Sequence, residues 1–354
     1  MLMFLIGSIN FIVDPGEIYL KKILADNKTS EFSKKLLSSK NGVVQSGWNE
    51  RLIKTTLAKK SGDFDCVILG SSRVKQISSI RNTGNIKNKC EKILNLGVSG
   101  GSLEDLSIFS YLIFNNINRP KKVFIGIDPW TFKFGVDSRY AQNENIYIQM
   151  NELLNENENN ESISYIKKLA GNLFNGEYFQ ASLKDLFDDK KSIIGDIFKK
   201  NIVFPEDGFS YKSGYKQEVT LPDGSHVYAK NWILKQKDKK VILGGPRSHW
   251  GIFGQIYDNK ALDYLQEIVV LYDKNEIELS LILTPYHPNV FKNGNTQPVK
   301  YYKSIENIVK TFGDENKLKV YGSFFPDIFG CKSEEFFDYM HPTIECLNRI
   351  DFSK

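Results

Sequence analysis

Three short apolar runs, each closed by a turn that contains glycine or aspartate, constrain the fold of this chain more than any other feature. The runs are Cys66 to Leu69 before Gly70-Ser71-Ser72, Lys92 to Leu96 before Gly97 to Ser102, and Lys122 to Ile127 before Asp128-Pro129. Short apolar runs bounded by turn residues predict buried strands. Helical spacing over 103–114 separates the second run from the third, and the turn at 70–72 is expected to lead into a helix as well.

The same alternation returns in the last third of the chain. It predicts helix Ala261 to Tyr272, strand Leu279 to Thr284, helix Tyr301 to Phe312, strand Leu318 to Tyr321, and a last helix that Pro342 begins. Strands that alternate with helices form right-handed crossovers and a parallel sheet, with functional residues at the carboxyl ends of the strands. The predicted fold class is therefore α/β with a central parallel sheet.

Two segments lie outside this alternation. Residues 14–65 are typical of a mainly helical lead-in, and residues 130–250 contain a polar stretch at 151–161 and a turn at Leu221 to Gly224. We interpret the second segment as an insertion at about 131–250. The chain is predicted to form one α/β domain, 19–354, behind a hydrophobic leader, 1–18.

The leader is uncharged from Met1 to Val13 and stops at Asp14-Pro15. It is shorter than the roughly 20 residues of a spanning helix and lacks the basic flank of a standard signal peptide. Three alternatives are open: a signal anchor whose start is missing, an uncleaved export signal, or a helix packed on the domain. We expect a membrane-anchored or exported, extracytoplasmic protein, on the cell surface or in the periplasm.

Composition excludes several classes of function. The 47 Lys and Arg residues are interleaved with 42 Asp and Glu, so nucleic-acid binding is not expected. The four cysteines are too scattered for a disulfide framework, and none has the CxxC spacing of a metal or redox site. The loop Gly97 to Ser102 has neither GxGxxG spacing nor the Walker lysine, so a nucleotide-binding fold is disfavoured. No metal and no cofactor are expected.

Ser72 is the candidate nucleophile. It follows a strand in Gly70-Ser71-Ser72-Arg73-Val74, where its hydroxyl can lie exposed at the sheet edge and its N–H at a helix amino terminus. The alternative is that Ser71 or Ser72 caps the next helix.

The candidate base lies far along the chain, in Phe337-Asp338-Tyr339-Met340-His341-Pro342. An aspartate three residues before a histidine can bring its carboxylate to Nδ1 and leave Nε2 free as a general base. Ser72, His341 and Asp338 are therefore the predicted catalytic residues. The alternative for His341 and Asp338 is a helix cap and a turn.

These residues also carry a family resemblance. The segment Val67 to Arg73 resembles the first block of the SGNH (GDSL-like) hydrolases, with Ser71 where Gly-Asp-Ser has aspartate. Asn95 to Gly100 is similar to the second block, and Asp338 to His341 to the closing Asp-x-x-His. The resemblance implies a flavodoxin-like, three-layer α/β fold with an inserted segment. It also implies that the N–H groups of Ser72 and Gly100 form the oxyanion hole.

The third block departs from the family pattern, because Gly126-Ile127-Asp128 offers a carboxylate where an asparagine amide usually donates to the oxyanion. An ionised aspartate cannot donate. Asp128 is therefore a candidate for binding a sugar hydroxyl or for pairing with Arg73. Arg73 could also hold an anionic sugar or lie on the surface.

Subsets of this superfamily that share Gly-Ser-Ser-Arg, the leader before Asp-Pro and a strand ending in Thr-Pro-Tyr-His-Pro resemble proteins that add or remove O-acetyl groups on bacterial surface polysaccharides. Here that stretch is Thr284 to Pro288. His287 is a candidate for substrate binding, with a loop histidine as the alternative. Four tryptophans are candidates for lining a carbohydrate groove, with the core as the alternative: Trp48, Trp130, Trp232 and Trp250. Those in or beside the insertion are the better candidates for sugar stacking.

The predicted function is serine-dependent acyl transfer or ester hydrolysis, as O-acetylation or deacetylation of a bacterial cell-surface glycan. The expected partners are the polysaccharide substrate and a membrane acyl-donor partner. The alternative is a non-catalytic glycan-binding or assembly subunit on a degenerate SGNH scaffold. The carboxylate of Asp128, in place of an amide donor, is the reason for considering it.

Overall fold

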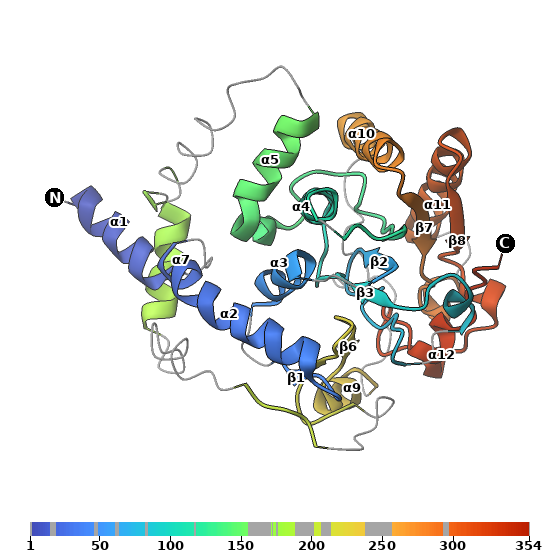
Figure 1. Ribbon diagram of the computed structural model, residues 1–354, viewed down its shortest axis with the longest axis horizontal. Coiled ribbons are helices and arrows are strands. Elements are labelled where there is room, and N and C mark those ends of the chain that lie inside the picture. Colours follow the sequence, from blue (N-terminus) through green and yellow to red (C-terminus); the bar gives the residue numbers. More distant parts are fainter. Residues whose placement is uncertain are drawn as a thin grey trace.

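The computed structural model describes residues 2–14, 19–45, 49–60, 64–81, 84–116, 118–154, 171, 173–174, 176–187, 202–206, 214–237, 257–292 and 297–353. Trp48, Trp250 and most of the polar stretch 151–161 lie outside these ranges. Among the described residues, the predicted strands and crossover helices form one α/β domain around a central sheet (Figure 1).

The central sheet has five strands, all parallel, in the order β3-β2-β4-β7-β8. The strands are β2 (Cys66–Leu69), β3 (Ile93–Asn95), β4 (Lys122–Gly126), β7 (Glu278–Leu283) and β8 (Lys319–Gly322). The predicted parallel sheet is therefore confirmed. Counted along the chain, the strand order is 2-1-3-4-5, which is the order of doubly wound, flavodoxin-like sheets. Ligands of such sheets bind where the order reverses, here between the carboxyl ends of β2 and β4.

One face of the sheet is covered by long helices. Val67 and Leu69 of β2 and Val123 and Ile125 of β4 belong to the large hydrophobic core on this face. The helices that cover it are α3 (Glu50–Lys60), α4 (Leu103–Phe114), α10 (Asn259–Lys274) and α11 (Gln297–Glu315). Figure 1 shows α4 and α10 on one side of the strands and α12 (Ile344–Leu347) on the other.

The opposite face is covered by shorter segments. Ile68, Phe124 and Ile282 point to a second core, which the 3-10 helix η1 (Gly84–Asn88), α12 and Phe352 complete. The last helix predicted after Pro342 is present, but as the four-residue α12.

The helix expected directly after Ser72 is not formed, and residues 71–76 make successive turns instead. The carbonyl groups of Val74 and Ile77 accept hydrogen bonds from the side-chain amide of Asn95, both at 2.8 Å. The backbone N–H groups of Val74, Lys75 and Ile77 bind the carbonyl three residues earlier, so the segment forms tight turns that do not continue into an α-helix. The expectation that Ser72 lies at a helix amino terminus was therefore wrong.

The cysteines also differ from the prediction, because all four are paired. Cys66 is bonded to Cys90 and Cys331 to Cys346, over sequence separations of 24 and 15 residues. The scattered spacing was misleading, because the fold brings the two cysteines of each pair together. The segment between Cys66 and Cys90 contains η1. Cys331–Cys346 closes the segment that contains Asp338 and His341.

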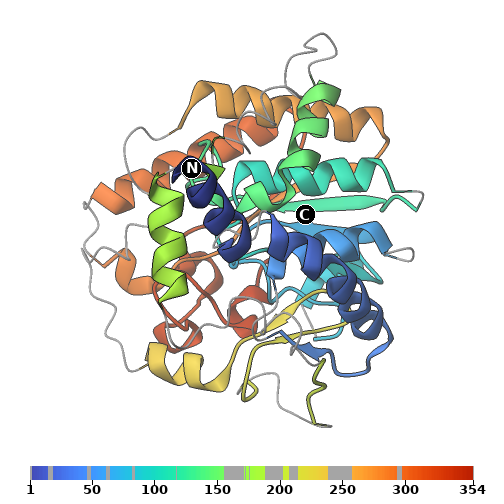
Figure 2. The ribbon, with the colours of Figure 1, turned by 90° about the vertical axis from the view of Figure 1, so that its left-hand side faces the viewer.

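The lead-in and the predicted insertion pack against each other. Helix α1 (Leu2–Val13) lies beside α7 (Gly176–Leu186), and α2 (Leu20–Ser38) leads to α3 (Figure 1, Figure 2). A small antiparallel sheet joins β1 (Val43–Val44), β5 (Val219–Thr220) and β6 (His226–Val227). Helix α5 (Glu144–Leu154) packs on α4, after the 3-10 helix η2 (Ser138–Asn143), and α9 (Lys230–Lys237) follows β6.

The hydrophobic leader is a helix packed on the domain in this structure. Asn10 donates a hydrogen bond to the carbonyl of Leu173 at 2.7 Å and accepts one from Ser182 at 2.8 Å. None of the described helices combines the length and the apolar content that crossing a membrane requires. The side of α1 away from α7 is nonetheless apolar and exposed, with Phe4 80% exposed.

Candidate functional site

Ser72 lies in a tight turn at the carboxyl end of β2. The turn begins at Gly70, which has a φ of +142°, and a Cβ on this residue would lie 3.1 Å from the carbonyl oxygen of Gly126 on β4. Only glycine combines this conformation with this closeness. The turn therefore passes directly over the end of β4, and Ser72 is partly exposed beside it.

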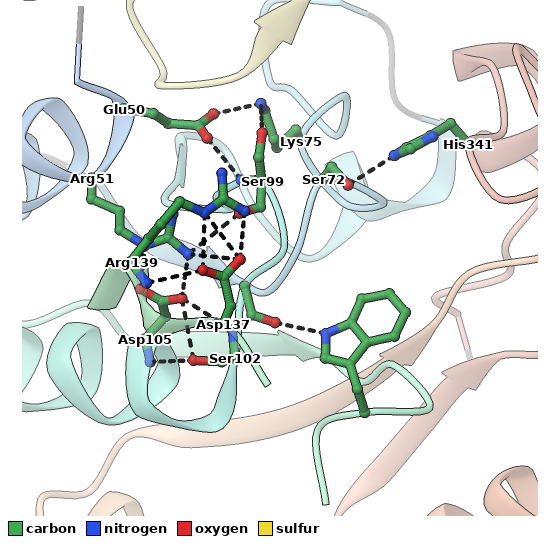
Figure 3. A network of polar contacts seen from close by, with 12 residues as sticks. Glu50, Arg51, Ser72, Lys75, Ser99, Ser102, Asp105, Asp137, Arg139 and His341 are labelled. Atoms are coloured by element: carbon green, nitrogen blue, oxygen red, sulfur yellow. Dashed lines mark hydrogen bonds and ion pairs between the residues drawn. The ribbon is translucent and has the colours of Figure 1, made fainter. Parts of the chain in front are cut away.

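The structure brings the three predicted catalytic residues together. His341 Nε2 lies 2.8 Å from Ser72 Oγ (Figure 3). His341 Nδ1 lies 2.8 Å and 3.0 Å from the two carboxylate oxygens of Asp338. A proton on Nδ1 is thus held by Asp338, and Nε2 can accept the proton of the Ser72 hydroxyl.

The Asp338 carboxylate is held in place by its own turn. Its Oδ1 accepts the N–H groups of Met340 and His341, both at 2.9 Å. Burial raises the pKa of Asp338, but the His341 ring and these two N–H donors outweigh it and lower the pKa to about 2. Asp338 is therefore ionised at neutral pH and can stabilise a positive charge on His341.

Arg73 is buried, which corrects two of the expectations for it. Its Nη1 donates to Asp128 Oδ1 at 3.0 Å, its Nε to the carbonyl of Met340 at 3.2 Å, and its Nη2 to the carbonyl of Thr284. The guanidinium carbon lies 3.6 Å from the ring centroid of Tyr286. Arg73 therefore joins the ends of β4 and β7 to the loop that carries the base, and it is neither a surface residue nor free to hold an anionic sugar.

Asp128 is buried as well, only 3% exposed, at the carboxyl end of β4. Burial raises the pKa of its carboxyl, and the neighbouring Arg73 guanidinium opposes that rise. Of the two expectations for Asp128, the structure contains the ion pair with Arg73. Contact with a sugar hydroxyl stays a prediction that the burial of the carboxylate does not favour.

His287, the candidate for substrate binding, is buried beside the loop that carries His341. Its ring Nδ1 accepts a hydrogen bond from the backbone N–H of Asn289 at 3.0 Å. Its backbone N–H donates to the carbonyl of Tyr339, also at 3.0 Å. Burial lowers its pKa. His287 therefore supports the Asp338 to His341 loop from the side of β7, and its burial does not favour the substrate-binding role, which stays a prediction.

The predicted oxyanion donors lie on two loops that touch. Gly100, with a φ of +65°, follows β3, and a Cβ on its neighbour Gly101 would lie 3.1 Å from the Cα of Ser71. No hydrogen bond within the described part of the chain uses the N–H of Ser72 or that of Gly100. Both N–H groups are thus available to an acceptor that enters the site.

An aromatic group beside His341 comes from the predicted insertion. Trp232 of α9 stacks on Tyr228 with ring centroids 4.5 Å apart, and its ring lies 5.9 Å from that of His341. The Tyr228 hydroxyl donates to the Ser72 carbonyl at 3.3 Å, and Phe337 packs against both rings. Of the candidate stacking tryptophans, Trp232 is at the site, whereas Trp130 is in the core and fully buried.

The sequence analysis missed a network of charged residues around Ser99 (Figure 3). Its members are Glu50, Arg51, Lys75, Asp105, Asp137 and Arg139. Charged residues scattered over a lead-in helix, a turn and an insertion are typical of a solvated surface, so no local pattern could have identified them. Tyr228 was missed because its contact with Ser72 spans 156 positions of sequence.

The site therefore offers a hydroxyl, an imidazole, a carboxylate and two N–H groups, which are the components of nucleophilic acyl chemistry. Over the described ranges, no group of three or more His, Cys, Asp or Glu side chains could hold a metal ion.

Comparison with known proteins adds no relative to this description. No protein-family model matches the sequence. A search of curated proteins finds no significant match either.

Proposed function

We propose that this protein is a serine esterase or O-acyltransferase of the SGNH type that moves an acyl group, in particular acetyl, on a cell-surface glycan. One observation carries the proposal: Ser72 Oγ lies 2.8 Å from His341 Nε2, and His341 Nδ1 lies 2.8 Å from Asp338. The strand order and the three sequence blocks support the assignment to the SGNH type.

In the first half of the reaction, Ser72 Oγ attacks the acyl carbonyl carbon as its proton passes to His341 Nε2. Asp338 stabilises the resulting imidazolium. When the tetrahedral intermediate collapses, the bond to the leaving alcohol breaks, and His341 returns the proton to the alcohol oxygen. The acyl group then remains on Ser72 as an ester.

In the second half, water or a sugar hydroxyl attacks this ester, with His341 as base, and Ser72 is released with its proton. Water gives an esterase and a sugar hydroxyl gives a transferase. The oxyanion is bound by the N–H groups of Ser72 and Gly100. A third donor at the position of Asp128 is absent, because that carboxylate is paired with Arg73. One such donor contributes about 10²- to 10³-fold in rate, so a modest turnover is expected.

The glycan substrate and the extracytoplasmic location are part of the proposal. Trp232 and Tyr228 beside His341 supply flat aromatic surface of the kind on which sugar rings stack. Two disulfides favour an oxidising compartment. The exposed apolar side of α1 favours contact with a membrane, where a membrane acyl-donor partner would also lie.

A fluorophosphonate probe tests the serine chemistry directly, because it labels only an activated serine. We expect labelling of the intact protein, no labelling of Ser72→Ala, and normal labelling of Ser71→Ala, the neighbouring serine. Release of acetate from purified surface polysaccharide, lost in Ser72→Ala, then tests the substrate class.

Two results would contradict the proposal. Labelling that survives Ser72→Ala would move the nucleophile elsewhere. A folded protein that is never labelled, yet binds the polysaccharide, would favour the non-catalytic glycan-binding subunit.

A further inference from the structure

Every polar group of Ser99 is held by a charged side chain (Figure 3). Its N–H donates to Glu50 Oε2 at 2.7 Å, and its hydroxyl accepts from Lys75 Nζ at 3.1 Å. Its carbonyl oxygen accepts from two guanidinium groups, Arg139 Nη2 at 2.8 Å and Arg51 Nη2 at 3.3 Å. Ser99 is the residue immediately before Gly100, the second predicted oxyanion donor.

The charged residues are themselves fixed. Arg51 is 3% exposed and binds Asp105 through a fork, with Nε 2.8 Å from Oδ1 and Nη2 2.7 Å from Oδ2. Asp105 also closes the capping box with Ser102 at the start of α4. Glu50 pairs with Lys75, and both side chains are largely buried. The loop after β3 is thus anchored at Ser99 and again at Ser102.

Stability alone does not explain why Glu50, Arg51 and Lys75 are charged where they are largely buried. Removing charges from water costs several kcal/mol per ion, and apolar residues of similar size often stabilise a protein as well or better. Buried charged groups can instead serve to hold a loop in one conformation. Here four charged side chains converge on one residue of a loop.

Peptide geometry links this network to the oxyanion donor. The carbonyl of Ser99 and the N–H of Gly100 belong to one planar trans peptide and point in opposite directions. Two guanidinium groups that hold the Ser99 oxygen therefore also fix the direction of the Gly100 N–H, which faces away from them. Positive charge at a carbonyl oxygen polarises the peptide and makes its N–H a stronger donor.

We propose that Arg139, Arg51, Glu50 and Lys75 are positioning residues that aim and polarise the Gly100 N–H toward the oxyanion. The inference rests on the proposed acyl chemistry of Ser72. It also supplies a reason why the site can work without the usual third donor, since two charge-assisted contacts strengthen one of the donors that remain.

Arg139 offers the cleanest test, because its side chain is 51% exposed and its loss should leave the fold intact. We expect Arg139→Ala to lower kcat for an aryl acetate about tenfold, a part of the 10²- to 10³-fold that a whole donor contributes. KM should stay within about twofold, since the contact acts mainly in the transition state. Arg139→Lys, which keeps one donor and the charge, should recover part of the loss.

Hydrolysis of the corresponding aryl thionoacetate distinguishes loss of the oriented Gly100 N–H from a general disturbance of the site. Its sulfur accepts hydrogen bonds poorly, so the oxyanion donors contribute less to its hydrolysis. Arg139→Ala and Glu50→Gln should therefore slow the acetate more than the thionoacetate. Tyr272→Phe is a matched control, because it removes a buried hydrogen bond to Ser110 of α4, 2.8 Å long, without touching the Ser99 network. It should slow neither substrate.

The two hypotheses fail differently. If Ser72→Ala keeps the esterase activity, the proposed function is wrong. If Ser72→Ala is inactive but Arg139→Ala keeps wild-type kcat, or slows both substrates equally, the positioning role is overturned. Arg139→Ala decides the question even if Glu50→Gln fails to fold.

Discussion

A buried carboxylate beside a buried guanidinium lies after the carboxyl end of β4, where the resemblance to the SGNH hydrolases leads us to expect an amide donor. Asp128 and Arg73 are 3% and 1% exposed, and they lie 3.0 Å apart. A carboxylate aimed at an oxyanion would oppose the reaction, whereas one that neutralises Arg73 stabilises the joint between three loops. The pair of Asp128 and Arg73 is thus a structural element next to the candidate site.

Replacement of Asp128 by asparagine tests this assignment. Asp128→Asn leaves the Arg73 charge buried without its partner, so the free energy of unfolding should fall by about 3 to 5 kcal/mol. Turnover of an aryl acetate should not increase. Urea denaturation and steady-state kinetics measure the two effects, and a variant that is both stable and faster would show that Asp128 occupies a vacant donor position.

Asp338 makes stability depend on pH. Its folded pKa of about 2 is below its ordinary value of 3.8, so its stabilising contribution is present above about pH 4 and is lost as the pH falls through 2. The loss should be about 2 kcal/mol. Urea denaturation of Asp338→Asn and the wild type between pH 5 and pH 2 measures this loss. If the free energy of unfolding falls equally with pH in both proteins, Asp338 is not its cause.

The residues of the candidate triad could be predicted because each lies in a short local pattern. Ser72 follows a strand within a glycine turn, and Asp338 precedes His341 by three positions. The surroundings of Arg73 could not be predicted, since its partners are 55, 211 and 267 positions away in sequence. The burial of His287 could not be predicted for the same reason, because it depends on a loop from another part of the chain.

At the scale of elements, the strands and crossover helices follow local sequence, and the turn after β2 does not. Apolar periodicity predicted α4 with its observed bounds, Leu103–Phe114. The segment after Ser72 was expected to be helical, but it forms tight turns, and the side chain of Asn95 binds two of its carbonyl groups. Contacts of this kind come from tertiary structure, so they leave no trace in the segment itself.

Helix α9 should contribute to glycan recognition through Trp232. Its ring is partly exposed and lies 5.9 Å from that of His341. A stacked aromatic contributes about 1 kcal/mol beyond its buried area, so Trp232→Ala should raise KM for the polysaccharide about fivefold or more. The effect on a small aryl acetate should be smaller. Leu234→Ala on the same helix, 49% exposed, is the control. Equal effects of the two substitutions on glycan KM would argue against stacking.

At the scale of the whole molecule, α1 lies beside α7 (Figure 1, Figure 2). Exposed apolar side chains occur on both helices and on the residues that flank α7: Met3, Phe4, Leu5, Phe11, Ile12, Phe174, Leu186 and Phe187. Helix α1 has no charged residue. These features motivate the proposed contact with a membrane surface.

Vesicle binding tests that contact. Burial of a phenylalanine contributes roughly 2 kcal/mol, so Phe4→Asn with Phe187→Asn should lower co-sedimentation with phosphatidylcholine vesicles more than about tenfold. Ile328→Asn, which alters a residue that is 65% exposed and outside both helices, should have little effect. Unchanged sedimentation of the double variant would remove α1 and α7 as a membrane contact.

Ser72 and His341 meet across 269 positions of sequence, and the base lies inside the ring that Cys331–Cys346 closes. During synthesis, the nucleophile, its loop partners and the first three strands leave the ribosome long before the base does. Until the carboxyl-terminal ring docks on the sheet, Ser72 has no histidine beside it to take its proton. Under the proposed function, a growing chain is therefore inert, and the proposed activity begins only when folding is nearly complete.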